Sequence, residues 1–418
     1  MNLPLNKNIH TIMHIDLNSC FATVEQQAYP NLRGRPIVIA AYTSPNGCVL
    51  APSIEAKRLG IKTGMTVRDA RLLCRDVIVS DPDPVMIRHA HLKFKNVLKN
   101  YSPNVIPKSI DELVVDFTGT LALKRGLKEV GFEIKKEIRQ AVGEWISCNI
   151  GISTNRFLAK LAAGLHKPDG LDIITADNLE KTYSNCMLLE LNGINTHFQA
   201  RLNANGIFTP SDFLHTSLET LQNRVFKSIN GYYWYLRLRG WEIDAVEFGR
   251  KSYGQSYALK EPTQNPKKIA RLMMKLCEKM GRRLRRHNFT AFGLHVATLY
   301  TDFSHWHTGR TFSTNLYTVQ ELFTKAIFLL NQQPERKKVR TLAVSCYHLS
   351  PTQPEQLTIE EINSQKRRKV QDAVDKINNR WGEYVITPLL MLGMNDVIVD
   401  RIAFGGAKEI EDLYAQPS

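Results

Sequence analysis

The stretch KSIDELVVDF, residues 108–117, places two neighbouring carboxylates, Asp111 and Glu112, directly before an apolar run. Val114 and Val115 in that run have the β-branched side chains that favour a strand. Because neighbouring side chains of a strand point to opposite faces, the two carboxylates can serve one site only if the backbone turns there. The sequence therefore predicts a buried strand entered through a turn that carries paired acids.

A second apolar run, near the N-terminus, ends in another acid. Ile12 to Ile15 is followed by Asp16 and then by a helix start, for which Asn18 or Ser19 is a plausible cap. Three carboxylates from two strand ends suit hard divalent cations such as Mg²⁺, which take oxygen ligands. Two such ions about 3.5–4 Å apart are typical of sites that transfer nucleotidyl groups. The alternative is that the acid pair before the second strand is an ordinary solvated turn.

Composition limits the class of protein and its partners. The 418 residues carry a formal net charge of +15, which favours an anionic partner. The sequence has no apolar run long enough to cross a membrane and no signal-peptide core at its start, so we expect a cytoplasmic protein without a membrane partner. The seven cysteines form no C-x-x-C pair, which favours reduced thiols over a zinc site or disulfides.

Between and after the two acid motifs, several short elements are predicted. Residues 36–40 and 48–51 read as two strands around a turn, and Ser53 to Gly60 as a short helix closed by its glycine. Lys57 in that helix is either part of a solvated face or a phosphate ligand, and composition does not decide between them. A further helix is predicted over residues 124–142.

Five motifs, taken in order, resemble the Y-family (translesion) DNA polymerases over about the first 350 residues. They are IDLNSCFATVE (15–25), NGCVLAPSIEAKRLGIKTGM (46–65), SIDEL (109–113), GISTNRFLAKLAA (151–163) and KPDG (167–170). Two segments, Asn18-Ser19 and Gly47-Cys48-Val49, look more like the bacterial polymerase V catalytic subunit than the polymerase IV type.

The resemblance implies an α/β multidomain fold, the right-hand polymerase. It assigns the palm, a mixed sheet with helices, to residues 1–19 and 84–180, small fingers to 20–83, a helical thumb with a helix-hairpin-helix to 181–245, an α/β little finger to 250–350, and a C-terminal extension of uncertain structure to 351–418. Residues 242–250 would link thumb and little finger.

The resemblance also implies a catalytic site and its cofactor. Asp16, Asp111 and Glu112 would hold two Mg²⁺ ions, with the backbone carbonyl of Leu17 as an additional ligand. The substrates would be a dNTP and primer-template DNA. In such a site one ion lowers the pKa of the primer 3′-hydroxyl and the other neutralises charge on the triphosphate.

The nucleotide would be held near the start of the first helix. The resemblance assigns triphosphate contacts to the backbone amides of Ser19, Cys20 and Phe21 and to the side chains of Lys57 and Lys167. Phe21 would also be the steric gate, a ring that collides with a ribose 2′-hydroxyl. The residues alone favour a different interpretation, in which Phe21 is a core residue of its helix. Ala51 and Ile54 stand where many polymerase IV-like relatives have a threonine and a tyrosine that bind the phosphates.

Two regions are predicted to bind DNA. Residues 189–207 resemble a helix-hairpin-helix in which Gly193 is the first turn glycine and Asn195 replaces the second, entering the left-handed conformation. The alternative there is an ordinary helix turn. Residues 251–350 hold 17 Lys or Arg and 5 Asp or Glu, a net charge of +12. Candidate DNA contacts in that segment are Lys251, Arg282, Arg283, Arg285, Arg286 and Arg310.

Beyond residue 351 the resemblance weakens. The sequence predicts an amphipathic helix that begins near Lys366 and carries Val370, Val374 and Ile377, followed by a loosely structured end from residue 400. Bacterial relatives bind the sliding clamp through C-terminal peptides, and the sequence shows no clear match. Gln320 to Phe323 is only superficially similar, with a buried helix as the alternative, and Ile410 to Tyr414 is a remote candidate.

The function expected from the resemblance is template-directed, low-fidelity DNA synthesis past damaged bases. The alternatives are a catalytically silent DNA-binding accessory protein of the same fold, and a nuclease that uses the same two ions. The three acids favour an enzyme, because a silent protein has no chemical reason to keep three metal ligands.

Overall fold

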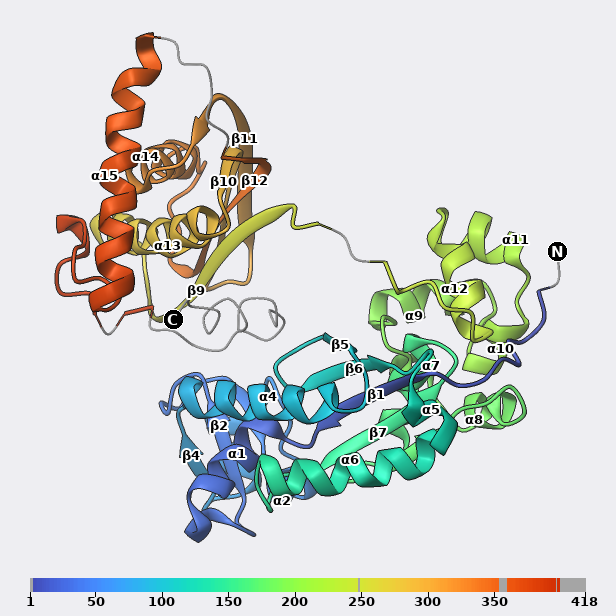
Figure 1. The fold of residues 1–418 in the computed structure, drawn as a ribbon. Coiled ribbons are helices and arrows are strands. Elements are labelled where there is room, and N and C mark those ends of the chain that lie inside the picture. The colour runs from blue at the N-terminus through green and yellow to red at the C-terminus, as the bar shows by residue number, and fades with distance from the viewer. Residues whose placement is uncertain (1–2, 247–248, 353–358, 396, 399–418) are drawn as a thin grey trace. The chain divides into compact units, whose positions relative to one another are not determined.

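Both acid-bearing strands lie side by side in a five-stranded sheet. In the computed structural model, which describes residues 3–246, 249–352, 359–395 and 397–398, the strand order is β5-β6-β1-β7-β8 (Figure 1). The strands are β5 (Asn104–Pro107), β6 (Glu112–Asp116), β1 (Ile12–Leu17), β7 (Cys148–Ser153) and β8 (Leu171–Ile173). Only β8 runs parallel to its neighbour, so the sheet is mixed, as predicted for the palm.

One face of this sheet carries the apolar core. Met13, Ile15 and Leu17 alternate along β1 and are at most 1% exposed. They pack with Leu113 and Val115 of β6 against three helices, because side chains of paired strands share a face. The helices over this face are α1 (Cys20–Ala28), α4 (Pro84–Lys99) and α6 (Leu127–Ala141). The helix predicted over residues 124–142 is in fact interrupted at Gly126 (φ 94°), which separates α5 (Leu121–Arg125) from α6.

The opposite face is covered by α7 (Arg156–Leu165), which lies very close to β7. A Cβ atom at Gly151 would stand 2.0 Å from the carbonyl oxygen of Ala159 and 2.2 Å from the amide nitrogen of Ala163. Glycine is therefore required at this position, because any side chain would push the helix off the sheet. The alternation that buries one face of β1 leaves His14 and Asp16 on the face of α7.

A small second sheet forms the predicted fingers region. Its order is β3-β2-β4, with β2 (Ile37–Ala40) and β3 (Val49–Pro52) antiparallel as the sequence predicts and β4 (Ile78–Ser80) added in parallel. The sequence analysis did not predict β4, a strand of three residues. The helices here are η1 (Pro30–Leu32), α2 (Ile54–Arg58) and α3 (Val67–Leu73). Ser53 caps α2 by accepting a hydrogen bond from the Ala56 amide.

Short helices follow, in the segment predicted as the thumb. They are α8 (Leu179–Ser184), η2 (Leu188–Glu190), α9 (Thr196–Asn203), α10 (Pro210–His215), α11 (Leu218–Thr220), η3 (Leu221–Val225) and α12 (Asn230–Leu238). Trp234 and Tyr235 of α12 are buried, whereas Tyr232 and Tyr233 are 39% and 38% exposed. Four aromatic residues in a row span more than one face of a helix, so they cannot all be buried on the same side.

The described residues between 249 and 398 form a second compact unit, built on a four-stranded antiparallel sheet. The order is β11-β10-β12-β9, with bounds β9 (Ser252–Thr263), β10 (Phe289–Tyr300), β11 (His305–Leu316) and β12 (Val339–Pro351). Helices α13 (Pro266–Arg286) and α14 (Val319–Leu330) pack on one face of this sheet (Figure 1). Of these strands, β11 was not predicted. Whether the palm, fingers, thumb and little finger boundaries mark functional modules stays a prediction.

Within the described residues, the C-terminal extension contains α15 (Ile359–Trp381) and η4 (Leu389–Met391). Polar contacts join α15 to the rest of the unit, including a hydrogen bond of 2.5 Å from the Tyr317 hydroxyl to Asp372. Val370, which we expected on an apolar face, is 65% exposed. The predicted loose end from residue 400, with the segment from Ile410 to Tyr414, lies outside the described residues.

The tight contact between β7 and α7 yields a test of the fold. Gly151→Ala should destabilise the first unit by about 1–3 kcal/mol, because the new methyl group overlaps the backbone of α7. Gly164→Ala in the same helix is the matched control. A Cβ there meets open space, so we expect a gain of about 0.5–1 kcal/mol from helix propensity. Thermal unfolding followed by circular dichroism measures both, and equal effects of the two variants would contradict the packing described.

Candidate active site

The pairing of β1 with β6 brings two of the three predicted acids together. Asp16 and Glu112 are directly opposite partners in the antiparallel register. Such partners have Cβ atoms about 4.5–5.5 Å apart and side chains on the same face. The two carboxylates therefore project together on the face that α7 covers.

The third acid is placed by the turn that precedes β6. The amides of Lys108 and Ser109 both donate to the carbonyl oxygen of Glu112, at 2.9 and 3.2 Å, which reverses the chain. The carbonyl oxygen of Asp111 accepts a hydrogen bond of 2.9 Å from the Leu17 amide. The backbone thus turns where the sequence analysis requires it, and Asp111 is tied to the end of β1.

Burial and like charge raise the pKa of Asp111. Burial is the largest cause, and the charges of Asp16 and Glu112 act in the same direction. A hydrogen bond of 2.5 Å from the Ser109 hydroxyl to Asp111 Oδ1 opposes them. The pKa of the buried Cys20 thiol is raised well above its ordinary value, first by burial and then by Asp111 and Asp16. The three acids therefore form one concentrated patch of negative charge.

Two lysines balance this charge. Lys167, predicted as a phosphate contact, forms an ion pair with Asp16. Lys160 of α7 lies with its Nζ 2.8 Å from Glu112 Oε2. His14 Nε2 is 3.8 Å from the same oxygen, but burial and the charge of Lys160 lower its pKa to about 3. His14 is therefore neutral at neutral pH and adds no charge.

The sequence analysis missed Lys160. Residues 156–165 are mostly small or apolar, and Lys160 is the single lysine among them. Lys167 lies beyond the end of α7, so no helical spacing relates the two lysines. A lone lysine within this run is the only signal that could have drawn attention to it.

Lys57 is near the same carboxylates. It lies in the last turn of α2, and partial burial of its ammonium lowers its pKa. The charge of Lys167 lowers the pKa further, while Asp16 and Asp111 act in the opposite direction. These electrostatic interactions indicate that Lys57 lies near Lys167, Asp16 and Asp111.

The turn that carries Lys167 is held by α6. Asp169, which has a left-handed backbone (φ 62°), pairs with Lys135 at 3.0 Å and with Arg139. A Cβ at Gly170 would lie 2.1 Å from the carbonyl oxygen of His166, so the turn needs glycine there. The lysine is thus presented by a braced turn, with its own side chain 47% exposed.

The N-terminus of α1 adjoins the acids. Ser19 occupies the N-cap position in a left-handed conformation (φ 50°), but its side chain makes no capping bond. Its buried Oγ has no hydrogen-bond partner among the described residues. Phe21 is 3% exposed and belongs to the palm core, so the structure gives its ring a packing role whether or not it also acts on the sugar.

The predicted hairpin of the thumb needs one correction. Gly193 has the expected left-handed backbone (φ 100°). Asn195 does not enter that region. Its φ of −100° is extended, and its side-chain oxygen accepts a 2.9 Å hydrogen bond from the Phe198 amide as the N-cap of α9. The physical reason is that an N-cap asparagine has an extended backbone, from which its side chain can accept a hydrogen bond from the first turn of the helix.

Two of the arginines predicted to bind DNA are buried instead. Arg285 is 6% exposed and contacts Asp375 of α15 at 2.6 and 3.0 Å, and Arg282 is 8% exposed and donates to Asn379 at 2.7 Å. Their side chains bind the C-terminal helix, which the sequence could not place, so the prediction of DNA contacts is wrong for these two as the chain is folded here.

The other basic residues of the second unit are more accessible. Lys251, Arg286 and Arg310 are exposed. Arg283 is half-buried and donates a 3.0 Å hydrogen bond to the Gly254 carbonyl. Whether these four contact DNA stays a prediction.

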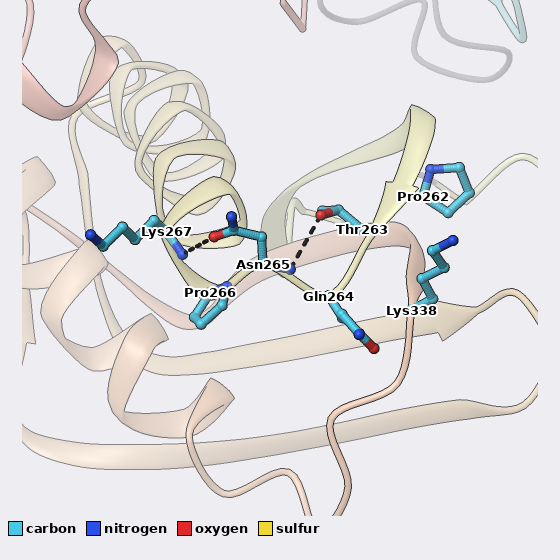
Figure 2. Close-up of a pocket in the computed structure, with 7 residues that line it drawn as sticks. All are labelled: Pro262, Thr263, Gln264, Asn265, Pro266, Lys267 and Lys338. Carbon is cyan, nitrogen blue, oxygen red and sulfur yellow. Dashed lines mark hydrogen bonds between the residues drawn. The ribbon is translucent and has the colours of Figure 1, made fainter.

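The cavity drawn in Figure 2 involves other residues. It has a volume of about 610 Å³ and is lined by residues 262–267 and Lys338 of the second unit. Asn265 caps α13 there by accepting a 2.9 Å hydrogen bond from the Lys267 amide (Figure 2). None of the predicted site residues lines it, so we locate the candidate active site at the carboxylates of the first sheet.

Two further findings bear on metals and membranes. Among the described residues, no three His, Cys, Asp or Glu side chains are placed so that they could together hold a metal ion. Lys160 and Lys167 pair here with two of the carboxylates.

No helix in the described part of the chain is long and apolar enough to span a bilayer.

Known proteins are similar to this chain over nearly its whole length. Residues 15–164 match the impB/mucB/samB family, and residues 250–359 match the C-terminal domain of that family. DNA polymerase IV of Pelotomaculum thermopropionicum is 30% identical, covering 93% of this chain and 97% of the relative. DNA polymerase IV of Moorella thermoacetica is 31% identical, covering 90% and 94%.

A solved structure shares the fold. It is a Y-family DNA polymerase chimera with a TM-score of 0.71 and 24% identity, covering 81% of this chain and 98% of that one. The relatives named above are polymerases IV, so they give no support to the expected likeness to the polymerase V catalytic subunit. Since the matches in sequence and in fold extend over both units, this chain belongs to the Y family of DNA polymerases.

Proposed function

We propose that this chain is a template-directed DNA polymerase that adds dNTPs to a primer 3′-hydroxyl and copies past damaged bases in the cytoplasm. The observation that carries the proposal is the pairing of Asp16 with Glu112 beside Asp111, in a chain of this family. Nucleotidyl transfer needs concentrated negative charge that can hold divalent cations at the reacting phosphate, and these three carboxylates supply it.

The chemistry of the donor set suits two Mg²⁺ ions. Carboxylate oxygens are the ligands that Mg²⁺ prefers, and a divalent cation would offset both the burial and the like charges that raise the pKa of Asp111. Asp16, Asp111, Glu112 and the Leu17 carbonyl would hold the ions. Asp16 and Glu112 would have to turn from their lysine partners to do so. The bound ions would activate the 3′-hydroxyl and neutralise charge on the phosphates.

The surrounding residues would bind the triphosphate. Lys57 and Lys167 carry charge next to the acids, and Lys167 is exposed enough to exchange Asp16 for a phosphate. The N-terminus of α1 offers its helix dipole and the unpartnered Ser19 hydroxyl to an anion. Ala51 and Ile54, where many polymerase IV-like relatives have a threonine and a tyrosine, would leave fewer hydrogen-bond donors for the phosphates.

Phe21 would select against ribonucleotides. Its ring is fixed by packing within the core of the palm, and a rigid ring is a better steric barrier than a mobile one. The packing explanation and the gate explanation are therefore compatible.

The DNA would be bound through its phosphates. Gly193 presents a tight turn of the thumb, and Lys251, Arg283, Arg286 and Arg310 supply positive charge in the second unit. For the sliding clamp we propose no site. Gln320 to Phe323 lies within α14, where Leu322 is fully buried and Gln320 is exposed, and this packing favours the alternative of a core helix.

Primer extension with Mg²⁺ and dNTPs tests the catalytic assignment. Asp111→Asn should lower extension at least about 100-fold while DNA binding is retained, because the amide keeps the shape of the side chain but loses its charge. Asp76→Asn, at an exposed position, is the matched control and should extend normally. An inert wild-type protein that binds DNA would support the silent accessory protein, and shortened primers would support the nuclease.

The sugar gate is tested with Phe21→Leu. Selectivity for dNTP over rNTP, measured as the ratio of kcat/KM values, should fall about tenfold or more, because the smaller side chain leaves room for a 2′-hydroxyl. Phe117→Leu is the matched control, since Phe117 is fully buried in the same core. If the two variants are equally stable and the Phe21 variant keeps the wild-type selectivity for dNTP over rNTP, Phe21 is not the steric gate.

Two neighbouring arginines of α13 should behave differently. Arg286→Gln should weaken DNA binding and reduce the slope of log affinity against log salt by about 1, because one phosphate contact is lost. Arg285→Gln should instead destabilise the second unit by about 3–5 kcal/mol, because Asp375 is left nearly buried without its charged partner. Fluorescence anisotropy measures the first effect and thermal unfolding the second. A salt slope unchanged in Arg286→Gln would contradict its DNA contact.

A further inference from the structure

We propose that Lys160 is a positioning residue that holds the Glu112 carboxylate beside Asp16 before divalent cations bind, and that its charge then competes with those cations. The inference rests on the proposed function, because it concerns the same carboxylates. It assigns to this lysine a role distinct from that of Lys167, which reaches the same site from the turn after α7.

The contact is direct. Lys160 Nζ lies 2.8 Å from Glu112 Oε2, a distance typical of a charge-assisted hydrogen bond. The two side chains are 33% and 21% exposed, so the pair is only partly screened by water. Because Asp16 is the register partner of Glu112, a contact that fixes Glu112 also fixes the separation of the two acids.

The helix that carries Lys160 is anchored at its first turn. Asn155 caps it by accepting a 2.8 Å hydrogen bond from the Leu158 amide, and its side-chain nitrogen donates to the carbonyl oxygens of Arg237 and Trp241. Arg156 pairs with Glu242 at 3.1 Å. Lys160 therefore projects from an anchored helix, which fixes where its side chain starts relative to Glu112.

The close packing of α7 on β7 adds a second constraint. Gly151 allows the helix backbone to approach to contact distance, and Gly151 is the register partner of His14, two residues from Asp16. The distance from α7 to the acids is thus set by backbone contact. A lysine held in this way stays next to Glu112 when a cation arrives.

Lys167 differs in this respect. Its side chain is 47% exposed and extends from a turn, so it can leave Asp16 for a phosphate. Of the two lysines that pair with the acids, Lys160 is the less exposed, at 33%. Removing its charge should leave the acids more negative, which strengthens cation binding but loosens Glu112.

The decisive measurement is the affinity of the full chain for Mn²⁺ in the absence of DNA. Electron paramagnetic resonance detects the free and bound ion. Lys160→Gln should bind Mn²⁺ about 3–30-fold more tightly, since one positive charge next to the site is gone. Without metal, the same variant should unfold at a lower temperature. Lys160→Arg keeps the charge and should restore wild-type affinity. Lys136→Gln, an exposed lysine of α6, is the matched control and should change neither property.

A double-mutant cycle isolates the pair. In a Glu112→Gln background, the gain in Mn²⁺ affinity from Lys160→Gln should be smaller, because the part that comes from releasing the Glu112 carboxylate is lost. In primer extension, Lys160→Gln should lower kcat at least about tenfold with a small change in the KM for dNTP, because the misplacement affects the reacting geometry and not nucleotide binding.

The outcomes separate the two proposals. Tighter Mn²⁺ binding that depends on Glu112 supports the role of Lys160 even if the wild-type chain extends no primer, in which case the proposed function fails. Extension by the wild type with unchanged Mn²⁺ affinity in Lys160→Gln overturns the role of Lys160 alone. Should Lys160→Gln fail to fold, Lys160→Met provides the same charge removal, and weaker Mn²⁺ binding in either variant also overturns the inference.

Discussion

The antiparallel pairing of β1 with β6 is the constraint on which the rest of the site depends. It sets Asp16 opposite Glu112, and the turn before β6 adds Asp111. Carboxylates this close repel one another, and burial makes the repulsion stronger. The sheet can keep them together only because cations balance them, and in this chain the cations are lysines delivered by α7 and by the turn after it.

Local sequence patterns predicted the parts of the site that depend on neighbours along the chain. An apolar run that ends in an acid predicted β1. An acid pair before β-branched residues predicted β6 and the turn that precedes it. The expectation that Asp16 and Glu112 share one site came from the family resemblance, and the order of strands that brings them together was not predicted. Lys160 was missed because its significance depends on how closely α7 packs on β7, and that distance is decided by tertiary contact at Gly151.

Charge alone was a poor guide to function in the second unit. Arg282 and Arg285 counted toward the +12 of residues 251–350, yet both are nearly buried against α15, whose acids and amides lie about 90 residues further along. A sum of charges over a segment cannot distinguish an arginine that faces solvent from one that holds another helix in place. The positive surface left for DNA is therefore smaller than composition suggests.

The same distinction applies to the two lysines at the acids. Both balance a carboxylate, so a sequence or a charge count treats them alike. Their placement differs, because Lys160 projects from a capped helix packed on the sheet and is 33% exposed, while Lys167 extends from the turn after that helix and is 47% exposed. A more exposed charge suits a site in which phosphates arrive and leave, and a less exposed charge suits the alignment of carboxylates. The mechanism therefore depends on where the fold places each cation, as well as on its presence.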